Sequence, residues 1–432
     1  MLPAHTKKIA PVILSRPSPA NNPPGRGLFH GWKIVGLSLL TQALQAGILI
    51  YAFGTLALAM EAAFATTRAE VMLSATVLAL SANLLSPWFG SLVDRYPLRR
   101  LMLIGISCLS IGLIAVAASQ NLWQAWLAFA TLLAAGNLLL GQLPTAALIT
   151  RWFDRLRGRA LGVAAVGTSL GGFLLPILLA LLIEALGWRL ALIALAVGAW
   201  LLTAPLIAKL VVDRPRDLAL SPDGGTGDAA VAKAAAPPSG DIRWILSRPL
   251  FWWLTIAVGI ALFVYTGLLS NLYPHAVNLG LPTARAGALM SLLAACSIVG
   301  KLGFGGLADR VDLRLTMATS FLLMIVGALL LGQSAAAPGL LAGVVLFGLA
   351  AGGLLPVWGA LVARGFGQRS FGRALGCMNL AMTPITLLSA PYAGYLFDRY
   401  GSYSPAFLSY CGILTLGLLA LAALRLPPHR EQ

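Results

Sequence analysis

The sequence predicts an all-α membrane protein with twelve transmembrane helices in two pseudo-symmetric six-helix bundles. The first reason is composition: 59% of the 432 residues are hydrophobic and 10% are charged, which is too apolar for a soluble globular protein. The second is that long, continuous apolar runs recur along nearly the whole chain, unlike the alternating strands of a barrel. The third is a repeat of short motifs between the two halves.

Each predicted helix is an apolar run long enough to cross a hydrocarbon core of about 30 Å. The first half, residues 30–210, predicts helices at 31–58, 70–93, 100–119, 122–150, 158–186 and 188–210. A hydrophilic stretch at 211–248, rich in Pro, Gly, Ala and Asp, predicts a linker. The second half, residues 249–426, predicts helices at 250–273, 284–308, 313–333, 338–363, 372–397 and 404–426. The ends predict a disordered N-terminal tail at 1–29, which is not a signal peptide, and a short C-terminal tail at 427–432.

Positive charge falls mainly on one side of the predicted membrane. The side that holds both tails and the linker carries 25 of the 30 Lys and Arg residues, whereas the loops of the other side carry 4. Because cytoplasmic loops are enriched in Lys and Arg, we expect both tails and the linker to be cytoplasmic. The net charge of +16 then reflects a phospholipid surface rather than a nucleic-acid partner. The Ala- and Leu-rich chain with short loops fits a bacterial inner membrane.

Residues that bind metals or carry out catalysis do not cluster in this sequence. The four cysteines lie within apolar segments without paired spacing, and the four histidines are scattered. No His-Glu-x-x-His motif and no pair of intramembrane aspartates occurs. We therefore expect no metal, no cofactor and no enzymatic activity.

Two motifs occur once in each half. The segment Gly90–Arg95, Gly-Ser-Leu-Val-Asp-Arg, is matched 215 residues later by Gly305–Arg310, Gly-Gly-Leu-Ala-Asp-Arg. The segment Gly158–Gly162, Gly-Arg-Ala-Leu-Gly, recurs unchanged 214 residues later as Gly372–Gly376. Repeats on corresponding helices at nearly one offset indicate two bundles related by an axis along the membrane normal. This arrangement predicts a central site between bundles that rock against each other.

Lys301 lies within an apolar helix, eight residues before Asp309. Eight residues span about 12 Å of helix axis at about 1.5 Å per residue, so Lys301 is well inside the hydrocarbon core if Asp309 marks its edge. A charge at that depth needs a wet cavity or a partner, which makes Lys301 a candidate binding residue. The alternative is a side chain that reaches back to the membrane surface.

At these residues the chain resembles the major facilitator superfamily of transporters. The segment Gly90–Arg100 is similar to the hallmark loop between the second and third helices of that family, and Gly305–Arg314 is a weaker copy. Two further segments resemble the branch of monocarboxylate transporters and oxalate–formate antiporters: Gly31–Gly54 in the first helix and Arg151–Arg189 through the fifth. The resemblance covers all twelve predicted helices and implies transport by alternating access.

In that branch, a cation eight residues before the loop aspartate is implicated in holding the substrate carboxylate, and Lys301 occupies this place. Arginine, the commoner residue there, binds a carboxylate with a fork of donors, whereas lysine acts as a point charge. Proton-coupled relatives carry an aspartate where this chain has Ser297 and a lysine where it has Tyr51. The oxalate-type relative has a second cation inside the eleventh helix, which this chain lacks. A single cation favours a monoanion, carried by proton symport or by anion exchange.

The resemblance also implies a gate at the cytoplasmic ends of the helices. Asp94 would meet the positive N-terminus of a helix, in the same or the other half, when the cytoplasmic side is shut, and Asp309 would repeat this contact. We assign four arginines near these loops to the same gate: Arg95, Arg310, Arg151 and Arg364. The alternative is that these charges only set the membrane topology.

Polar residues within the apolar helices are further candidates for substrate binding. Two stripes at helical spacing stand out, Ser38, Thr41, Gln42 and Gln45 in the first helix and Asn379, Thr383 and Thr386 in the eleventh. Such stripes either line a cavity or join helices by hydrogen bonds. Beside Lys301, we select nine residues as substrate-binding candidates: Ser297, Tyr51, Gln45, Thr41, Gln142, Tyr265, Trp358, Asn379 and Thr383.

The sequence therefore predicts a monomeric secondary active transporter in the lipid bilayer, with a small organic anion as substrate, above all a monocarboxylate. Its coupling partner would be a proton or a second anion. The alternative is an exporter of lipophilic or drug-like solutes on the same fold, although such exporters usually use an intramembrane acid that this chain lacks. A membrane-embedded enzyme lacks its catalytic motifs here, and a non-transporting sensor would be favoured by a longer C-terminal tail.

Overall fold

Helices account for nearly all of the chain in the computed structural model. The structure describes residues 29–218, 220–224, 241–333 and 337–424, and these ranges contain helices but no strand. Twelve helices in the described part are long and apolar enough to cross a membrane, which confirms the predicted fold class. The chain is therefore a multi-pass membrane protein. The predicted C-terminal tail, nearly all of the N-terminal tail and the middle of the linker lie outside the described residues.

The six spans of the first half occupy the predicted ranges, with ends shifted by a few residues. Four spans are single helices: α3 (Arg68–Arg95), α4 (Leu98–Ala118), α8 (Arg157–Leu186) and α9 (Trp188–Leu210). The first span consists of α1 (His30–Ala46), the π-helical turn η1 (Gly47–Tyr51) and α2 (Phe53–Phe64). The fourth consists of α5 (Leu122–Ala128), the π-helical turn η2 (Phe129–Leu133), α6 (Ala134–Leu140) and α7 (Gln142–Trp152). Sequence periodicity does not predict these irregular turns.

The second half repeats the pattern after a linker that holds the short turns η3 (Pro215–Leu218) and η4 (Pro222–Gly224) and helix α10 (Ile242–Leu246). Its first four spans are α11 (Pro249–Asn278), α12 (Thr283–Ala308), α13 (Leu313–Gln333) and α14 (Ala337–Phe366). The eleventh span, predicted as one helix, consists of α15 (Phe371–Leu387) and α16 (Ser389–Tyr400). The twelfth span is the single helix α17 (Ser404–Ala422).

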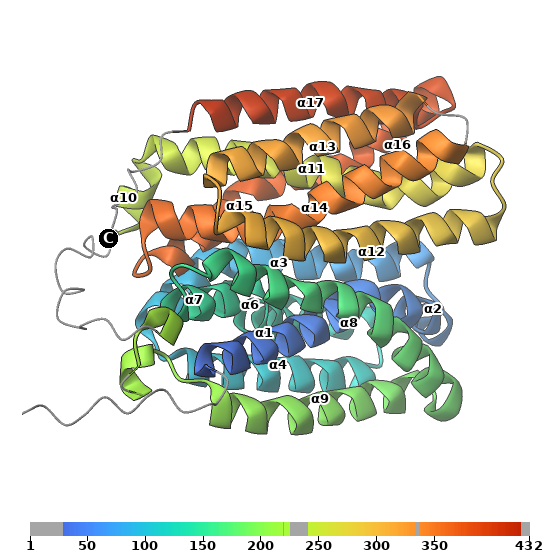
Figure 1. Ribbon diagram of the computed structural model, residues 1–432. Helices are drawn as coiled ribbons and strands as arrows, with labels where there is room; N and C mark the ends of the chain where they lie inside the picture. Colours follow the sequence, from blue (N-terminus) through green and yellow to red (C-terminus); the bar gives the residue numbers. More distant parts are fainter. Residues whose placement is uncertain (1–28, 219, 225–240, 334–336, 425–432) are drawn as a thin grey trace, which may run out of the picture.

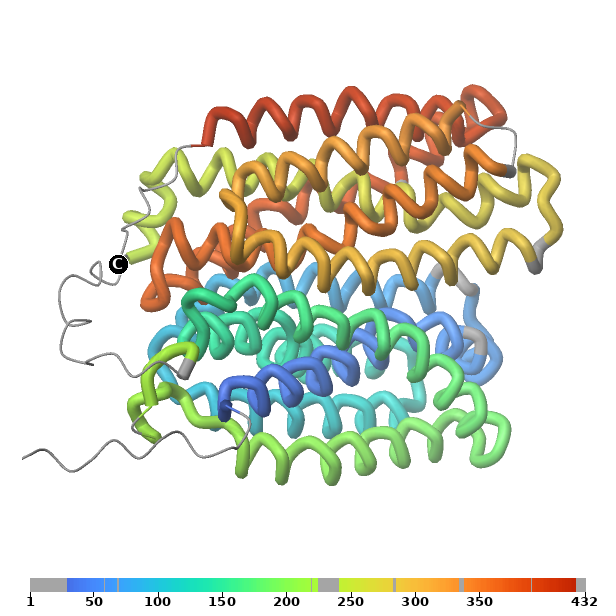
Figure 2. Tube along the Cα trace, in the orientation of Figure 1, coloured from blue at the N-terminus to red at the C-terminus, as the bar shows by residue number. Residues whose placement is uncertain are grey.

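The two halves lie side by side, with α1–α9 in one bundle and α11–α17 in the other (Figure 1). They meet along two seams, in which α8 packs against α12 and α3 packs against α15. Helix α9 ends, and α1 and α11 begin, at one end of the molecule, which we call the linker end (Figure 2). Each seam therefore joins a helix that ends at a repeated Asp-Arg motif to a helix that begins with the repeated Gly-Arg-Ala-Leu-Gly motif.

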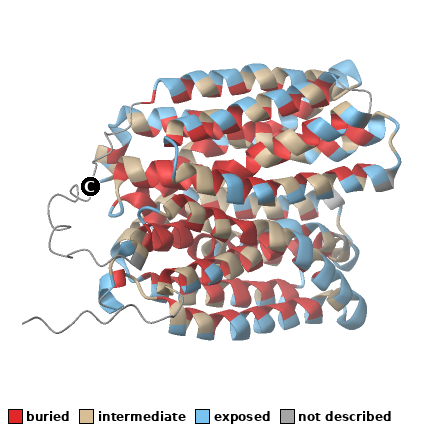
Figure 3. Cartoon of the chain, in the orientation of Figure 1, coloured by how far each residue is buried: buried red, intermediate tan, exposed pale blue. Residues whose placement is uncertain are grey.

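Glycines allow the two halves to approach closely along these seams. A Cβ atom at Gly162 would overlap the backbone oxygen of Lys301, and one at Gly90 would overlap that of Gly372. Small residues at such positions let helix backbones pack together within a membrane. Buried residues gather on the helix faces that point into the bundles (Figure 3), whereas large apolar side chains such as Phe173 are exposed on the outside. An apolar outer surface suits contact with lipid.

Candidate functional site: a polar cavity between the two halves

A cavity of about 300 Å³ lies between the two bundles. Its volume is at the lower end of that of sites for small molecules, which suits a small solute. Eleven polar side chains from seven spans line it: Gln42, Gln45, Tyr51, Asn83, Asn137, Gln142, Thr168, Tyr265, Ser297, Lys301 and Asn379. Among the described residues of this lining, Lys301 is the only charged one.

The Lys301 side chain is buried, with a relative exposure of 6%, and it does not reach back to the membrane surface. Its Nζ atom donates hydrogen bonds to the Thr168 hydroxyl at 2.7 Å and to the Ser169 hydroxyl at 2.6 Å, both on α8 of the other half. Among the residues that the structure describes, no carboxylate forms an ion pair with it. An ammonium group has three N–H donors, so one is left for an acceptor in the cavity.

Polar pairs hold the remaining wall of the cavity in place. Gln45 donates a hydrogen bond to Asn137, and the Gln42 amide donates to the Thr145 hydroxyl at 3.1 Å. The first helix thus uses its polar stripe in both of the ways considered, since these glutamines line the cavity and also join α1 to the fourth span. Tyr51 and Tyr265, from opposite halves, both line the cavity.

The cavity lining includes seven of the ten residues selected from the sequence and leaves out Thr41, Thr383 and Trp358. Thr41 is fully buried and its hydroxyl donates to the Ser38 carbonyl within its own helix. Thr383 likewise donates to the Asn379 carbonyl one turn earlier, and Trp358 is a buried core residue with 2% exposure. Residues that share one face of a helix can still contact different neighbouring helices, so only some residues of a polar stripe line the cavity.

Sequence reasoning did not select Asn83, Thr168 or Ser169. Asn83 is an isolated polar residue in the apolar helix α3, and the Thr-Ser pair lies in a glycine-rich stretch of α8 that reads as a packing face. Their role depends on which residue of the other half lies opposite them across the seam. A single sequence does not give this pairing between helices. No signal in the sequence distinguishes this pair, since Thr319 and Ser320 form a similar pair inside α13.

At the linker end, Asp94 at the end of α3 contacts the start of α15 in the other half. Its carboxylate accepts hydrogen bonds from the backbone N–H groups of Gly372 at 2.8 Å and Arg373 at 3.0 Å. The Arg373 side chain lies 3.8 Å from the same carboxylate, and Arg151 donates to the carbonyl of Val93 at 2.9 Å. A carboxylate at a helix N-terminus is stabilised by the unpaired N–H groups and by the helix dipole.

Asp309 makes the same contact on the other seam. Its carboxylate accepts the backbone N–H groups of Gly158 at 2.5 Å and Arg159 at 2.9 Å, at the start of α8. Burial raises the pKa of the Asp309 carboxyl, and these backbone donors offset part of that rise. We call the Asp94 and Asp309 contacts the two latches. Together they join the halves at the linker end, and each pairs one repeated motif with the other.

The four arginines assigned to the gate lie in different settings. Arg151 contacts α3 beside the Asp94 latch, whereas Arg95 is exposed at the end of that helix. Arg310 is also exposed and lines a second cavity at the linker end. Arg364 lies 3.6 Å from Asp312, but both residues belong to the second half, so this ion pair does not bridge the bundles.

Removing both hydroxyl partners of Lys301, in the double variant Thr168→Val, Ser169→Ala, is expected to raise the KM for a transported anion about tenfold, because a hydrogen bond to a charged group contributes about 1.5 kcal/mol or more. The reason is that these hydroxyls fix two N–H donors and leave the third directed to the cavity. Uptake kinetics in proteoliposomes would measure the change. Thr131→Val is the matched control, since that exposed hydroxyl only donates to the Leu127 carbonyl of its own helix. Equal KM values for the double variant and the control would contradict this orienting role.

Two helical bundles around a polar cavity, with latches at one end, define a membrane transporter. The chain belongs to the Major Facilitator Superfamily, whose model matches residues 37–311 and 275–432. It is 28% identical over 411 residues to monocarboxylate transporter 13 of Bos taurus, covering 94% of this chain and 91% of that protein. It is also 28% identical over 408 residues to monocarboxylate transporter 11 of Mus musculus, covering 91% and 86%. The homologues are transporters, not enzymes, and the chain resembles the monocarboxylate branch as its motifs indicate.

Solved structures share the fold. The proton:xylose symporter XylE has a TM-score of 0.75 at 13% sequence identity, covering 92% of this chain and 96% of that one. The human organic anion transporter MFSD10 has a TM-score of 0.64 at 17% identity, covering 90% and 99%. At these identities the likeness establishes the arrangement of the helices alone.

Proposed function

We propose that the protein is a secondary active transporter of a small organic monoanion, with a monocarboxylate as the leading substrate class. The observation that carries this proposal is the buried Lys301 ammonium, which has no carboxylate partner in the described part of the chain and opens on a polar cavity. A buried charge is costly without a counter-charge, so the site favours an anion that supplies one. The hydroxyl and amide groups around it would bind the remaining oxygens of the substrate.

The charge balance of the cavity favours one negative charge over two. The part of its lining that the structure describes has a single cation and no carboxylate, so a monoanion gives a neutral complex, whereas a dianion leaves one charge uncompensated. The names of the relatives, which are monocarboxylate transporters, support the same substrate class. The described residues of the lining also include no acid that could carry a coupling proton beside Lys301. Proton symport would therefore need a proton site elsewhere, whereas anion exchange would not.

Alternating access would operate by rocking of the two bundles about the cavity. The excess of Lys and Arg in the tails, the linker and the loops at the linker end favours a cytoplasmic position for that end. With both latches formed, the cavity would be shut from the cytoplasm. The protein would then act as a monomer in the bacterial inner membrane, with the bundles of residues 30–210 and 249–426 as its moving units.

An uptake screen over small organic acids tests this function. We expect proteoliposomes with the protein to accumulate at least one monocarboxylate faster than empty liposomes, whereas the matching dicarboxylate enters no faster. A pH gradient that accelerates uptake indicates proton symport, and acceleration by preloaded anion indicates exchange. A protein that transports only lipophilic cations, and no carboxylate under either condition, would overturn the proposal in favour of an exporter.

A further inference from the structure

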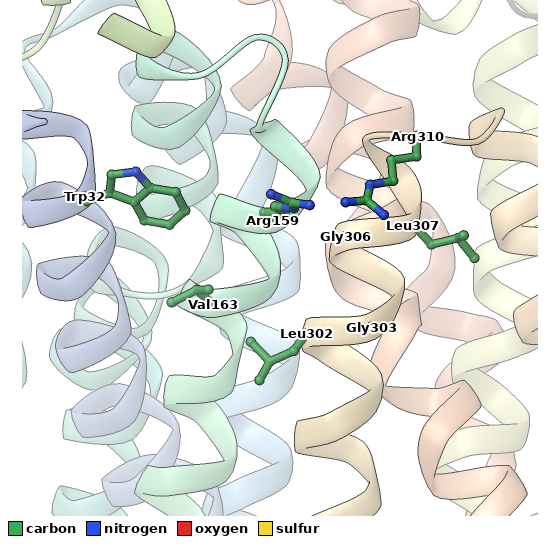
Figure 4. Close-up of a pocket in the computed structure, with 8 residues that line it drawn as sticks. All are labelled: Trp32, Arg159, Val163, Leu302, Gly303, Gly306, Leu307 and Arg310. Atoms are coloured by element: carbon green, nitrogen blue, oxygen red, sulfur yellow. The ribbon is translucent and has the colours of Figure 1, made fainter.

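A second cavity, of about 500 Å³, lies at the linker end of the seam between α8 and α12 (Figure 4). It shares no lining residue with the polar cavity between the halves. Its lining consists of Trp32 from α1, Arg159 and Val163 from α8, and Leu302, Gly303, Gly306, Leu307 and Arg310 from or just after α12. We call it the seam groove.

The seam groove brings two arginines from different halves together. Figure 4 shows the guanidinium groups of Arg159 and Arg310 directed toward one another across the gap between their helices. In the described ranges neither group has a carboxylate within ion-pair distance. The nearby Asp309 carboxylate attracts Arg159 but is hydrogen-bonded by backbone N–H groups. Two like charges facing each other disfavour the closed seam, and an anion between them reverses this effect. A phosphate matches the fork of donors that each guanidinium presents.

The remainder of the groove is apolar and sterically open. Val163, Leu302 and Leu307 line it, and a Cβ atom added at Gly303 would meet no other atom within 4 Å. A Cβ atom at Gly306 would meet only the Arg159 side chain, so the two glycines leave a strip of α12 free of side chains. Trp32 from α1 lies at the level of the two arginines (Figure 4), and tryptophans are enriched at the level of lipid headgroups.

We propose that the seam groove binds an anionic phospholipid, with its phosphate between Arg159 and Arg310 and an acyl chain along the glycine strip of α12. Paired cations at the membrane edge and an apolar channel leading inward fit the two parts of such a lipid. Because one arginine comes from each half, the bound phosphate holds the seam closed beside the Asp309 latch. This lipid site does not depend on which solute the carrier moves.

Titration of the purified full-length protein in neutral detergent with phosphatidylglycerol tests the site, with the thermal midpoint as readout. We expect stabilisation by phosphatidylglycerol, and little by phosphatidylcholine or by inorganic phosphate. Arg310→Gln and Arg159→Gln should each weaken the apparent affinity at least about tenfold, because each removes a charge-assisted contact with phosphate. Gly303→Leu should weaken it similarly, since leucine fills the groove and leaves both charges in place. Arg99→Gln is the control, because it removes an exposed charge at the same end outside the groove.

Three results would overturn this site. Equal weakening by Arg99→Gln would mean that the lipid responds to surface charge in general. Unchanged affinity in both Gly303→Leu and Arg310→Gln would mean that the lipid binds elsewhere. Stabilisation by inorganic phosphate as large as that by phosphatidylglycerol would mean a site for free anions rather than for lipid. The thermal midpoints of the variants without lipid report whether each one folds, and Arg310, being exposed, is the substitution least able to disturb the fold.

Discussion

Replacing Lys301 by alanine is expected to abolish carboxylate uptake, with a loss of at least about thirtyfold, because removing one partner of a buried charge pair costs about 2 to 5 kcal/mol or more. Lys301 supplies the only charge among the described residues that line the polar cavity, so none of the others there can neutralise the substrate. The measurement is initial uptake of a labelled monocarboxylate into proteoliposomes, normalised to the amount of inserted protein.

Three further variants separate loss of the charge from loss of the fold. Lys301→Met removes a buried charge that has no anionic partner in the described chain, so it should insert and melt at least as well as the parent protein while failing to transport. Lys301→Arg should retain partial activity, since it keeps the cation but changes its donor geometry. Lys33→Ala, at an exposed position of α1, should transport normally. Normal uptake by Lys301→Ala would contradict the role of Lys301 in binding the substrate anion.

The sequence was sufficient to predict the spans, because an apolar run of transmembrane length has one stable outcome in lipid, a helix with its backbone groups satisfied. It was not sufficient for the interruptions. The π-helical turn Gly47–Tyr51 lies within an unbroken apolar run, and its formation depends on packing against the other helices. Gly47 faces the backbone of Gly171 on α8, a contact that only the folded bundle creates.

The latches illustrate where repeat analysis reaches its limit. Sequence comparison identifies Asp94 and Asp309 as equivalent, and Gly158 and Gly372 as equivalent, but it does not pair the two motifs. The structure pairs them crosswise between the halves. The family resemblance implies a helix N-terminus as the partner of each aspartate, and the bundle arrangement then selects which one.

Among the site residues, too, some could be predicted from the sequence and others could not. A lysine inside an apolar helix is conspicuous whatever its surroundings, so Lys301 could be chosen from the sequence. Thr168 and Ser169 could not, since a hydroxyl in a transmembrane helix usually bonds to its own backbone. Thr168 also makes such a bond, to the Ala165 carbonyl, while accepting from Lys301. Its role therefore depends on the residue across the seam.

The double variant Asp94→Asn, Asp309→Asn is expected to shift the carrier about a hundredfold toward a conformation open at the linker end, because each carboxylate–backbone latch contributes about 1.5 kcal/mol or more. Each single variant should shift it about tenfold, and the effects should multiply because both latches act on one equilibrium between closed and open states. The shift should also lower the rate of transport, since the carrier would close less often at that end.

Cys377 provides the readout for this equilibrium. It is buried on α15, about one turn after Gly372 and Arg373, whose backbone N–H groups bind Asp94. A polar maleimide should therefore modify Cys377 only when the linker end opens. The other cysteines, Cys108, Cys296 and Cys411, would first be replaced by serine. Asp312→Asn is the matched control, because it removes a carboxylate at the same end whose ion pair lies within one half. If Cys377 reacts no faster in the double variant than in this control, the two aspartates do not hold the halves together, and their charges serve only membrane topology.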